Sequence, residues 1–239
     1  MRWLIQPDSP LCLANLPQLD IDDCVGVAGP IGDFRGQLLA TEAHGIDSWV
    51  MKRQLEYSTG RHFAHLAMQT LGEKPTAVER RADRSPIWPV HFLGSIAHCE
   101  DMGIAIVARA HACRGIGVDI ERRGRIGADL FATLFTEHER CAISSGTSAT
   151  ELFCAKEALY KAVHPIVQTF INFTDVSFVH EAAASGEAIY VGNEQPVDKF
   201  ISSALFSKQL TLAHACVVAW LPHAIQGGRR NTRFPMQHR

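Results

Sequence analysis

The chain has 239 residues, of which 46% are hydrophobic and 20% charged, and its formal net charge is −2. This composition is ordinary for a globular protein and far from that of a disordered chain, and the near-neutral charge gives no global bias toward nucleic acid or an anionic membrane surface. Seven cysteines without a C-x-x-C pair are typical of reduced, buried thiols, and no apolar stretch reaches the roughly 20 residues of a membrane span. We therefore expect a cytoplasmic protein with no membrane span and no nucleic-acid partner, in which any site for a polyanion is built from local clusters.

The first hundred residues predict short strands, then helix. Apolar runs at 24–28 and 38–40 indicate strands separated by turns. Residues 46–71 contain no proline and one glycine, and their apolar residues recur with helical spacing, which predicts one long or two broken helices ending at Gly72. The polar, proline-bearing stretch 80–89 is typical of a loop.

Further strands are predicted at 103–110 and 115–121, joined by a short turn at 112–114. C-terminal strands are predicted at 176–180, 188–191 and 210–221. A basic tail follows at 223–239, which we expect to be flexible. No internal sequence repeat is detected, and strands and helices alternate without a regular βαβ order. The sequence therefore predicts an α+β protein.

The clearest predicted helix covers residues 149–163. Ser148 followed by Glu151 forms a capping box, in which the side chains accept hydrogen bonds from the first N–H groups. Leu152, Ala155, Leu159 and Ala162 form an apolar stripe, and His164-Pro165 is expected to end the helix.

Two carboxylates share one face of the strand at 115–121. Side chains at i and i+2 of a strand point the same way, so Asp119 and Glu121 lie together while Val118 and Ile120 face the core. Such a pair suits Mg²⁺, which takes few carboxylates together with substrate phosphates. A solvated strand end balanced by neighbouring arginines is the alternative.

Three further groups of residues have both a functional and an ordinary interpretation. Glu157 and Lys161 lie one helical turn apart, as many exposed ion pairs do. Ser95 and His98 precede a predicted strand, where a histidine can bind phosphate or simply be exposed. The basic loci 52–61 and 80–84 can grip phosphate oxygens or face solvent.

These motifs occur together in one order. The Asp-x-Glu pair is followed 36 residues later by Lys-Glu in Phe-x-x-Lys-Glu-Ala-x-x-Lys at 153–161. Upstream stand Gly60-Arg61, Arg84-x-Pro-x-Trp-Pro and Gly94-Ser95-x-x-His98. The combination, over about residues 52–161, resembles the 4′-phosphopantetheinyl transferase superfamily, and in particular its enterobactin-synthetase-associated bacterial branch. His65, His91 and Ala97 depart from the pattern of that branch.

The resemblance implies a role for each matching residue. One Mg²⁺, with Mn²⁺ as an alternative, is implied at Asp119, Glu121 and Glu157. The implied catalytic residues are Glu157, which alternatively acts as or orients the base, and Lys161. The implied contacts to coenzyme A, which is a substrate, are Arg61, Arg84, Ser95, His98, Lys156 and Lys161.

The resemblance also implies a reaction and an architecture. The 4′-phosphopantetheine arm of coenzyme A passes to a serine of an apo acyl or peptidyl carrier protein, and 3′,5′-ADP is released. The larger members are monomers of two similar halves related by a pseudo-twofold axis, which places a coenzyme-binding half at 1–110 and a metal-binding half at 111–222. Another Mg²⁺-dependent phosphoryl-transfer enzyme and an inactive module that binds carrier proteins are the alternatives.

Overall fold

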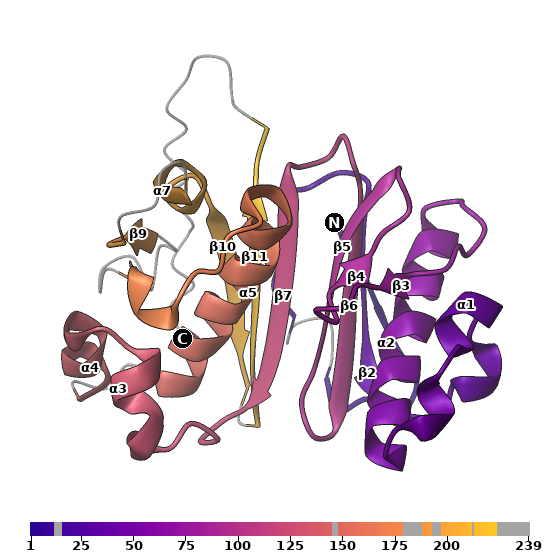
Figure 1. The fold of residues 1–239 in the computed structure, drawn as a ribbon, viewed down its shortest axis with the longest axis horizontal. Coiled ribbons are helices and arrows are strands. Elements are labelled where there is room, and N and C mark those ends of the chain that lie inside the picture. Colours follow the sequence, from indigo (N-terminus) through magenta and orange to yellow (C-terminus); the bar gives the residue numbers. More distant parts are fainter. Residues whose placement is uncertain (12–15, 145–147, 179–187, 193–196, 212, 224–239) are drawn as a thin grey trace, which may run out of the picture.

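The computed structural model describes residues 1–11, 16–144, 148–178, 188–192, 197–211 and 213–223. Two sheets stand side by side at the centre, with helices on their outer faces (Figure 1). The strands are β1 (Arg2–Ile5), β2 (Cys24–Pro30), β3 (Glu79–Arg80), β4 (Pro86–Ile87), β5 (Phe92–His98), β6 (Met102–Arg109), β7 (Gly115–Arg122), β8 (Val176–Phe178), β9 (Ala188–Tyr190), β10 (Leu205–Leu210) and β11 (His214–Leu221). The helices are α1 (Ala40–Ala43), α2 (Met51–Thr70), α3 (Phe131–Leu134), α4 (Glu137–Ser144), α5 (Ala149–Val167) and α7 (Val197–Ile201), with short 3₁₀ turns at Arg35–Gln37, Ile46–Ser48, Ala128–Leu130 and Phe173–Asp175.

The two main sheets share a three-stranded topology, to which the first sheet adds β1 beside β2. The first has the order β1-β2-β6-β5 and the second the order β10-β11-β7. In each, a first strand (β2 or β7) leads to a long helix (α2 or α5). A hairpin follows, whose second strand (β6 or β11) lies between its partner and the first strand, antiparallel to both. The structure thus has two similar α+β halves, although the sequence shows no repeat, and it confirms the predicted fold class.

The layers are helix, sheet, sheet and helix. Ile104 and Ile106 of β6, Val118 of β7 and Val218 of β11 belong to one apolar cluster between the sheets. A second cluster lies between α2 and its sheet, and a third lies between α5 and β11. Alternate residues of each strand therefore face either the partner sheet or a helix, as the two-residue period of a strand requires.

Gly117 allows α5 to pack unusually close to β7. A Cβ atom at this position would meet the backbone oxygen of Ala158 at 1.9 Å and the backbone nitrogen of Ala162 at 2.7 Å. Real Cβ atoms do not approach backbone atoms so closely, so only glycine fits. Asp119, two residues further along the strand, is consequently close to the side chains of α5.

Several sequence predictions are confirmed. The long helix predicted at 46–71 is a 3₁₀ turn followed by α2, and Gly72 after it has φ of +84°. The strands predicted at 103–110 and 115–121 are β6 and β7. Ser148 caps α5 by accepting a hydrogen bond from the Glu151 backbone N–H at 3.3 Å. Local signals were sufficient at these positions because the caps and the apolar periodicity agree.

Others are wrong. Residues 38–40 are not a strand, because the Glu42 side chain accepts from the Leu39 backbone N–H and starts α1 at Ala40. The loop at 80–89 contains the short β3–β4 hairpin. Pro165 does not stop α5: the helix continues to Val167, and the Gln168 N–H after it donates to the His164 carbonyl at 2.8 Å, with φ of +51° at Gln168. A proline in the last turn removes one hydrogen bond, which the packed helix tolerates.

The C-terminal strands also differ from expectation. The run 210–221 is the end of β10, a turn and β11, because the Thr211 hydroxyl accepts from the backbone N–H groups of Ala213 and His214 and reverses the chain. Gly94-Ser95-x-x-His98 lies inside strand β5. Residues 179–180 of one predicted strand, and the predicted tail beyond 223, lie outside the described residues. Among the described residues no helix is long and apolar enough to cross a membrane.

Candidate active site

Asp119 and Glu121 project from β7 toward α5. Their neighbours Val118 and Ile120 are fully buried between the sheets, so the alternation predicted from the sequence is confirmed. The Asp119 side chain is 9% exposed and that of Glu121 is 16% exposed. Two carboxylates are therefore held side by side with little contact with water, which rules out the interpretation as a solvated strand end.

Lys161 and Glu157 complete the cluster from α5. Lys161 Nζ lies 2.7 Å from Asp119 Oδ1 and 3.9 Å from Glu157 Oε2, and it donates to the Val118 carbonyl at 3.3 Å. The i,i+4 pair of the helix is thus tied to a strand that lies about forty residues earlier in the chain. The ordinary interpretation as a pair exposed to solvent does not hold, since Lys161 is bound to Asp119.

Within the described part of the chain, one oxygen of each strand carboxylate has no hydrogen-bond partner. Among the described residues, Asp119 Oδ2 and Glu121 Oε2 are buried and unpaired, and the Arg125 Nε lies 3.6 Å from Glu121 Oε2, too far for a hydrogen bond. Leaving a buried carboxylate oxygen unpaired is costly. A divalent cation between two such oxygens removes that cost, and an all-oxygen donor set suits Mg²⁺. The two strand carboxylates therefore suit the ion that the sequence predicts, and Glu157 as a third ligand stays a prediction.

The pKa values of the clustered side chains reflect their burial and the short distances between their charges. Burial, followed by the repulsion of Asp119, raises the pKa of Glu121 to about 7. Burial also raises the pKa of Glu157. Burial alone would lower the pKa of Lys161, but the carboxylates of Asp119 and Glu157 outweigh it and raise the pKa. Lys161 therefore stays protonated, and its single positive charge does not neutralise all the acidic side chains around it.

His98 lies at the end of β5, near the same cluster. Arg53 NH1 is 2.9 Å from His98 Nε2, and Glu56 Oε2 is 3.6 Å from it. A guanidinium only donates hydrogen bonds, so His98 Nε2 accepts, and the imidazole is neutral. Burial lowers the pKa of His98, which favours the same form. Arg53 belongs to the basic locus predicted at 52–61. Glu56 was not predicted as a site residue, because a single carboxylate on a basic helix forms no recognisable motif.

Ser95 joins the two sheets. Its hydroxyl is buried and accepts a hydrogen bond from the Val118 backbone N–H at 3.0 Å, across the junction between β5 and β7. This contact holds β7 at the point where it carries Asp119. Ser95 therefore supports the site from behind, and the coenzyme contact implied for it by the resemblance stays a prediction.

We expect Ser95→Ala to lower the free energy of unfolding by about 1–3 kcal/mol, because the buried Val118 N–H loses its partner. Urea unfolding followed by circular dichroism measures the change, with the exposed Ser202→Ala as the control. An unchanged midpoint together with a weaker affinity for coenzyme A would instead favour a direct contact.

Arg61 is buried on α2. Its guanidinium donates to the carbonyls of Val78 at 2.8 Å and Glu79 at 3.3 Å and lies 4.2 Å from the centre of the Tyr57 ring. These contacts hold the segment before β3 against α2. An arginine has five N–H groups, so a phosphate contact from Arg61 depends on those that remain.

The departure at His65 has a structural explanation. His65 Nε2 lies 3.0 Å from Glu42 Oε1, which also accepts from the Val78 backbone N–H at 2.7 Å. The His65 side chain is thus paired with a buried carboxylate.

The other predicted or departing positions lie elsewhere. Arg84 is exposed in the turn between β3 and β4, with φ of +71°. Ala97 is buried in the cluster between the sheets, and His91 is exposed.

Lys156 has no ammonium proton available for a phosphate. Its Nζ lies 2.7 Å from Glu139 Oε2 and donates to the carbonyls of Phe173 at 2.6 Å and Val176 at 2.8 Å. An ammonium has three protons, and these three contacts use all of them. The phosphate contact predicted for Lys156 is replaced by a structural role, which the sequence could not reveal because Glu139 lies on a different helix.

A cavity of about 130 Å³ opens beside Glu157. Tyr160 on α5 and Phe170, Asn172 and Phe173 in the segment after it form part of its wall, which is largely apolar. No sequence pattern indicated these residues, because aromatic side chains in an irregular segment follow no periodic pattern. Of the residues in the acidic cluster, Glu157 lines this cavity.

Comparison with known families agrees with this arrangement. Residues 41–108 match the family model described as the 4′-phosphopantetheinyl transferase N-terminal domain. Residues 115–216 match the model of the 4′-phosphopantetheinyl transferase superfamily, and this match contains Asp119, Glu121, Glu157 and Lys161. The chain therefore belongs to the 4′-phosphopantetheinyl transferase superfamily, which confirms the resemblance.

Individual relatives support the same assignment. The chain is 34% identical over 144 residues to 4′-phosphopantetheinyl transferase Npt of Nocardia iowensis, which is 59% of this chain and 65% of the relative. It is 32% identical over 153 residues to 4′-phosphopantetheinyl transferase PptT of Mycobacterium tuberculosis, covering 62% and 67%. It is 34% identical over 137 residues to enterobactin synthase component D of Escherichia coli O157:H7, covering 54% and 62%. The matched part thus spans about two thirds of the length of these relatives.

Proposed function

We propose that this protein transfers the 4′-phosphopantetheine arm of coenzyme A to a serine of an apo acyl or peptidyl carrier protein and releases 3′,5′-ADP. The observation that carries this proposal is the pair of unpaired, buried oxygens of Asp119 and Glu121 beside the Lys161 ammonium. Phosphoryl transfer depends mainly on positioning and charge stabilisation, and acids that bind a metal together with a cation supply both.

Asp119, Glu121 and Glu157 would hold Mg²⁺, for which Mn²⁺ could substitute. When bound, the ion would neutralise charge on the diphosphate of coenzyme A and polarise its phosphorus for attack. Lys161, fixed by Asp119, is placed to stabilise the charge that develops on the leaving 3′,5′-ADP. As the alternative role of Glu157, which borders the cavity, we propose that it acts as or orients the base that receives the proton of the serine hydroxyl.

The remaining site residues fit a polyanionic substrate. Arg84 is exposed, and Arg53 accompanies His98 near the carboxylates, so we propose these residues for the phosphates that lie away from the metal. The apolar wall of the cavity beside Glu157 suits the pantetheine arm, whose chain is largely methylene groups and amides. We also propose that coenzyme A binds between the halves 1–110 and 111–222. The protein is proposed to be a monomer and to be located in the cytoplasm.

Intact mass spectrometry of an apo carrier protein incubated with this protein, coenzyme A and Mg²⁺ tests the function. We expect the carrier to gain the mass of one phosphopantetheine arm, and no gain when its serine is replaced by alanine. If several apo carriers remain unmodified while nucleotides or phosphate esters are hydrolysed, the protein is another Mg²⁺-dependent phosphoryl-transfer enzyme. If carriers bind without any reaction, it is an inactive binding module.

Replacing Lys161 with alanine is expected to lower kcat by roughly 100-fold, as for a lost proton donor or charge stabiliser, with a small effect on coenzyme A affinity. Initial rates from the mass assay and calorimetric titration with coenzyme A separate the two effects. Lys74→Ala, which removes an exposed lysine, is the control. Loss of affinity with an unchanged kcat would make Lys161 a binding residue only.

A further inference from the structure

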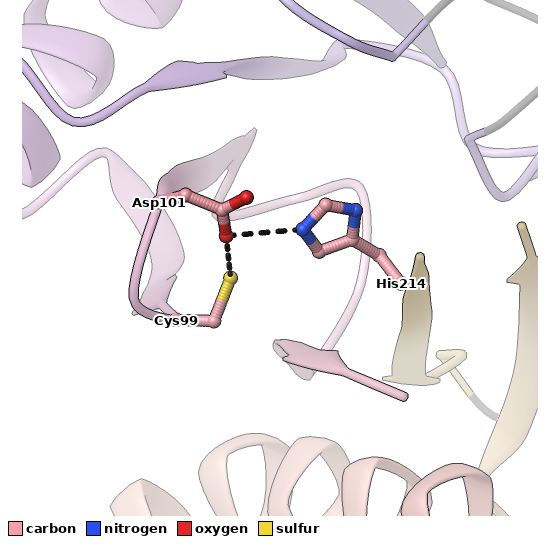
Figure 2. Close-up of side chains that lie close together, drawn as sticks. All are labelled: Cys99, Asp101 and His214. Atoms are coloured by element: carbon pink, nitrogen blue, oxygen red, sulfur yellow. Dashed lines mark hydrogen bonds and ion pairs between the residues drawn. The ribbon is translucent and has the colours of Figure 1, made fainter. Parts of the chain in front are cut away.

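Cys99, Asp101 and His214 form a second cluster of metal-ligating side chains (Figure 2). Cys99 and Asp101 lie in the turn between β5 and β6, and His214 is the first residue of β11, 113 residues beyond Asp101. Cys99 Sγ donates to Asp101 Oδ1 at 3.3 Å, and His214 Nε2 lies 3.1 Å from the same oxygen. One ligand atom from each residue lies within 4.8 Å of the others. The fold therefore brings together a thiol, a carboxylate and an imidazole.

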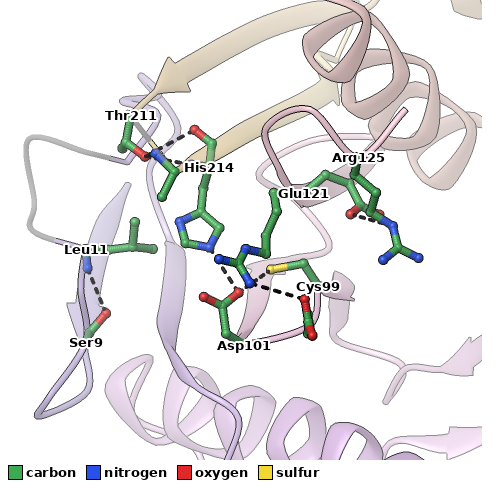
Figure 3. Close-up of polar contacts among 11 residues, drawn as sticks. Ser9, Leu11, Cys99, Asp101, Glu121, Arg125, Thr211 and His214 are labelled. Carbon is green, nitrogen blue, oxygen red and sulfur yellow. Dashed lines mark hydrogen bonds and ion pairs between the residues drawn. The ribbon is translucent and has the colours of Figure 1, made fainter. Parts of the chain in front are cut away.

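Two of the three residues in this cluster are buried, and the third is partly exposed to solvent. Cys99 and His214 are buried, whereas the Asp101 side chain is 42% exposed. The backbone N–H and carbonyl of His214 both bond to Thr211, which holds the start of β11 (Figure 3). An ion can thus reach preformed ligands from the Asp101 side.

These ligand types select one kind of metal. Zn²⁺ takes sulfur, imidazole nitrogen and carboxylate oxygen, often as three protein ligands with water in the fourth position. Mg²⁺ prefers oxygen alone and is better matched by Asp119 and Glu121. We propose that Cys99, Asp101 and His214 bind one Zn²⁺ at a site separate from the carboxylates of the catalytic cluster.

A metal here would connect the two halves of the molecule. The β5–β6 turn belongs to the first sheet and β11 to the second, and β11 pairs with β7, where Val217 lies opposite Asp119. Cys99 directly follows His98. Binding of Zn²⁺ therefore favours the folded state by linkage and fixes the spacing between His98 and the strand that carries Asp119.

Titration of the metal-free protein with Co²⁺, used as a spectroscopic substitute for Zn²⁺, tests the site without reference to activity. We expect one equivalent to produce a thiolate-to-cobalt charge-transfer band and to be displaced by Zn²⁺. Cys99→Ser retains a hydroxyl that can donate to Asp101 but supplies no thiolate. We therefore expect Cys99→Ser to lose the band and to weaken Zn²⁺ binding by more than about 10-fold.

The controls identify which residues bind. Cys141→Ser, at an exposed position, should leave the band unchanged, and Asp119→Ala should also keep it because the catalytic cluster is not involved. Asp101→Asn, at a partly exposed side chain, should weaken binding while the protein stays folded. The proposal is overturned if stoichiometric Co²⁺ gives no thiolate band, if the band persists in Cys99→Ser, or if Zn²⁺ raises the melting temperature of wild type and Cys99→Ser equally.

Discussion

Replacing Asp119 with alanine is expected to lower the rate of phosphopantetheine transfer by roughly 10²–10³-fold while the protein remains folded. The variant removes one of the two buried oxygens that we propose for Mg²⁺ and releases the Lys161 ammonium. Loss of metal charge stabilisation amounts to several kcal/mol of transition-state energy, which corresponds to this range of rates.

The fold should survive because removing Asp119 also removes a buried carboxylate oxygen that has no partner among the residues that the structure describes. Lys161 is 27% exposed and can turn its ammonium toward water. Initial rates by mass spectrometry, urea unfolding and calorimetric titration of Mg²⁺ in the presence of coenzyme A measure the three consequences. Asp129→Ala, at an exposed acidic residue, is the matched control.

Asp119→Asn adds a second control, since it preserves the shape of the side chain and removes its charge. We expect it to resemble the alanine variant in rate and in Mg²⁺ affinity. Turnover close to wild type in either variant would refute the assignment of Asp119 as a metal ligand. Loss of the folded state in both would show that the carboxylate serves the structure instead.

Replacing Lys156 with methionine is expected to lower the free energy of unfolding by about 3–5 kcal/mol, because it leaves the Glu139 carboxylate buried without its cation. Glu139 would keep its bonds from the backbone N–H groups of Thr136 and Phe178, which compensate only part of the charge. Two carbonyls, of Phe173 and Val176, would also lose a donor.

Urea unfolding of Lys156→Met measures this effect, and Lys199→Met provides a control at an exposed lysine of the same half. The double variant Glu139→Gln with Lys156→Met should recover part of the stability, since the buried charge is then absent. Coenzyme A affinity of the folded fraction should remain near wild type. An unchanged midpoint with much weaker binding of coenzyme A would restore the phosphate contact predicted from the sequence.

The sequence alone determined the elements whose signals are local. The Ser148–Glu151 cap and the apolar stripe of α5 predicted its start and its buried face, and the alternation around Asp119 predicted which side chains of β7 turn away from the core. The order and spacing of the motifs indicated the family. These features follow from backbone periodicity and capping, which act over a few residues.

Tertiary structure decided what depends on residues far apart in the chain. The repeated strand order of the two halves arises from pairing and leaves no trace in the sequence. Lys156 is structural because Glu139 lies opposite it, Ser95 supports Val118 across the two sheets, and Pro165 remains helical because α5 is packed. The contact between Asp101 and His214 spans 113 residues. In each case the partner of a side chain is set by long-range packing, which local patterns do not encode.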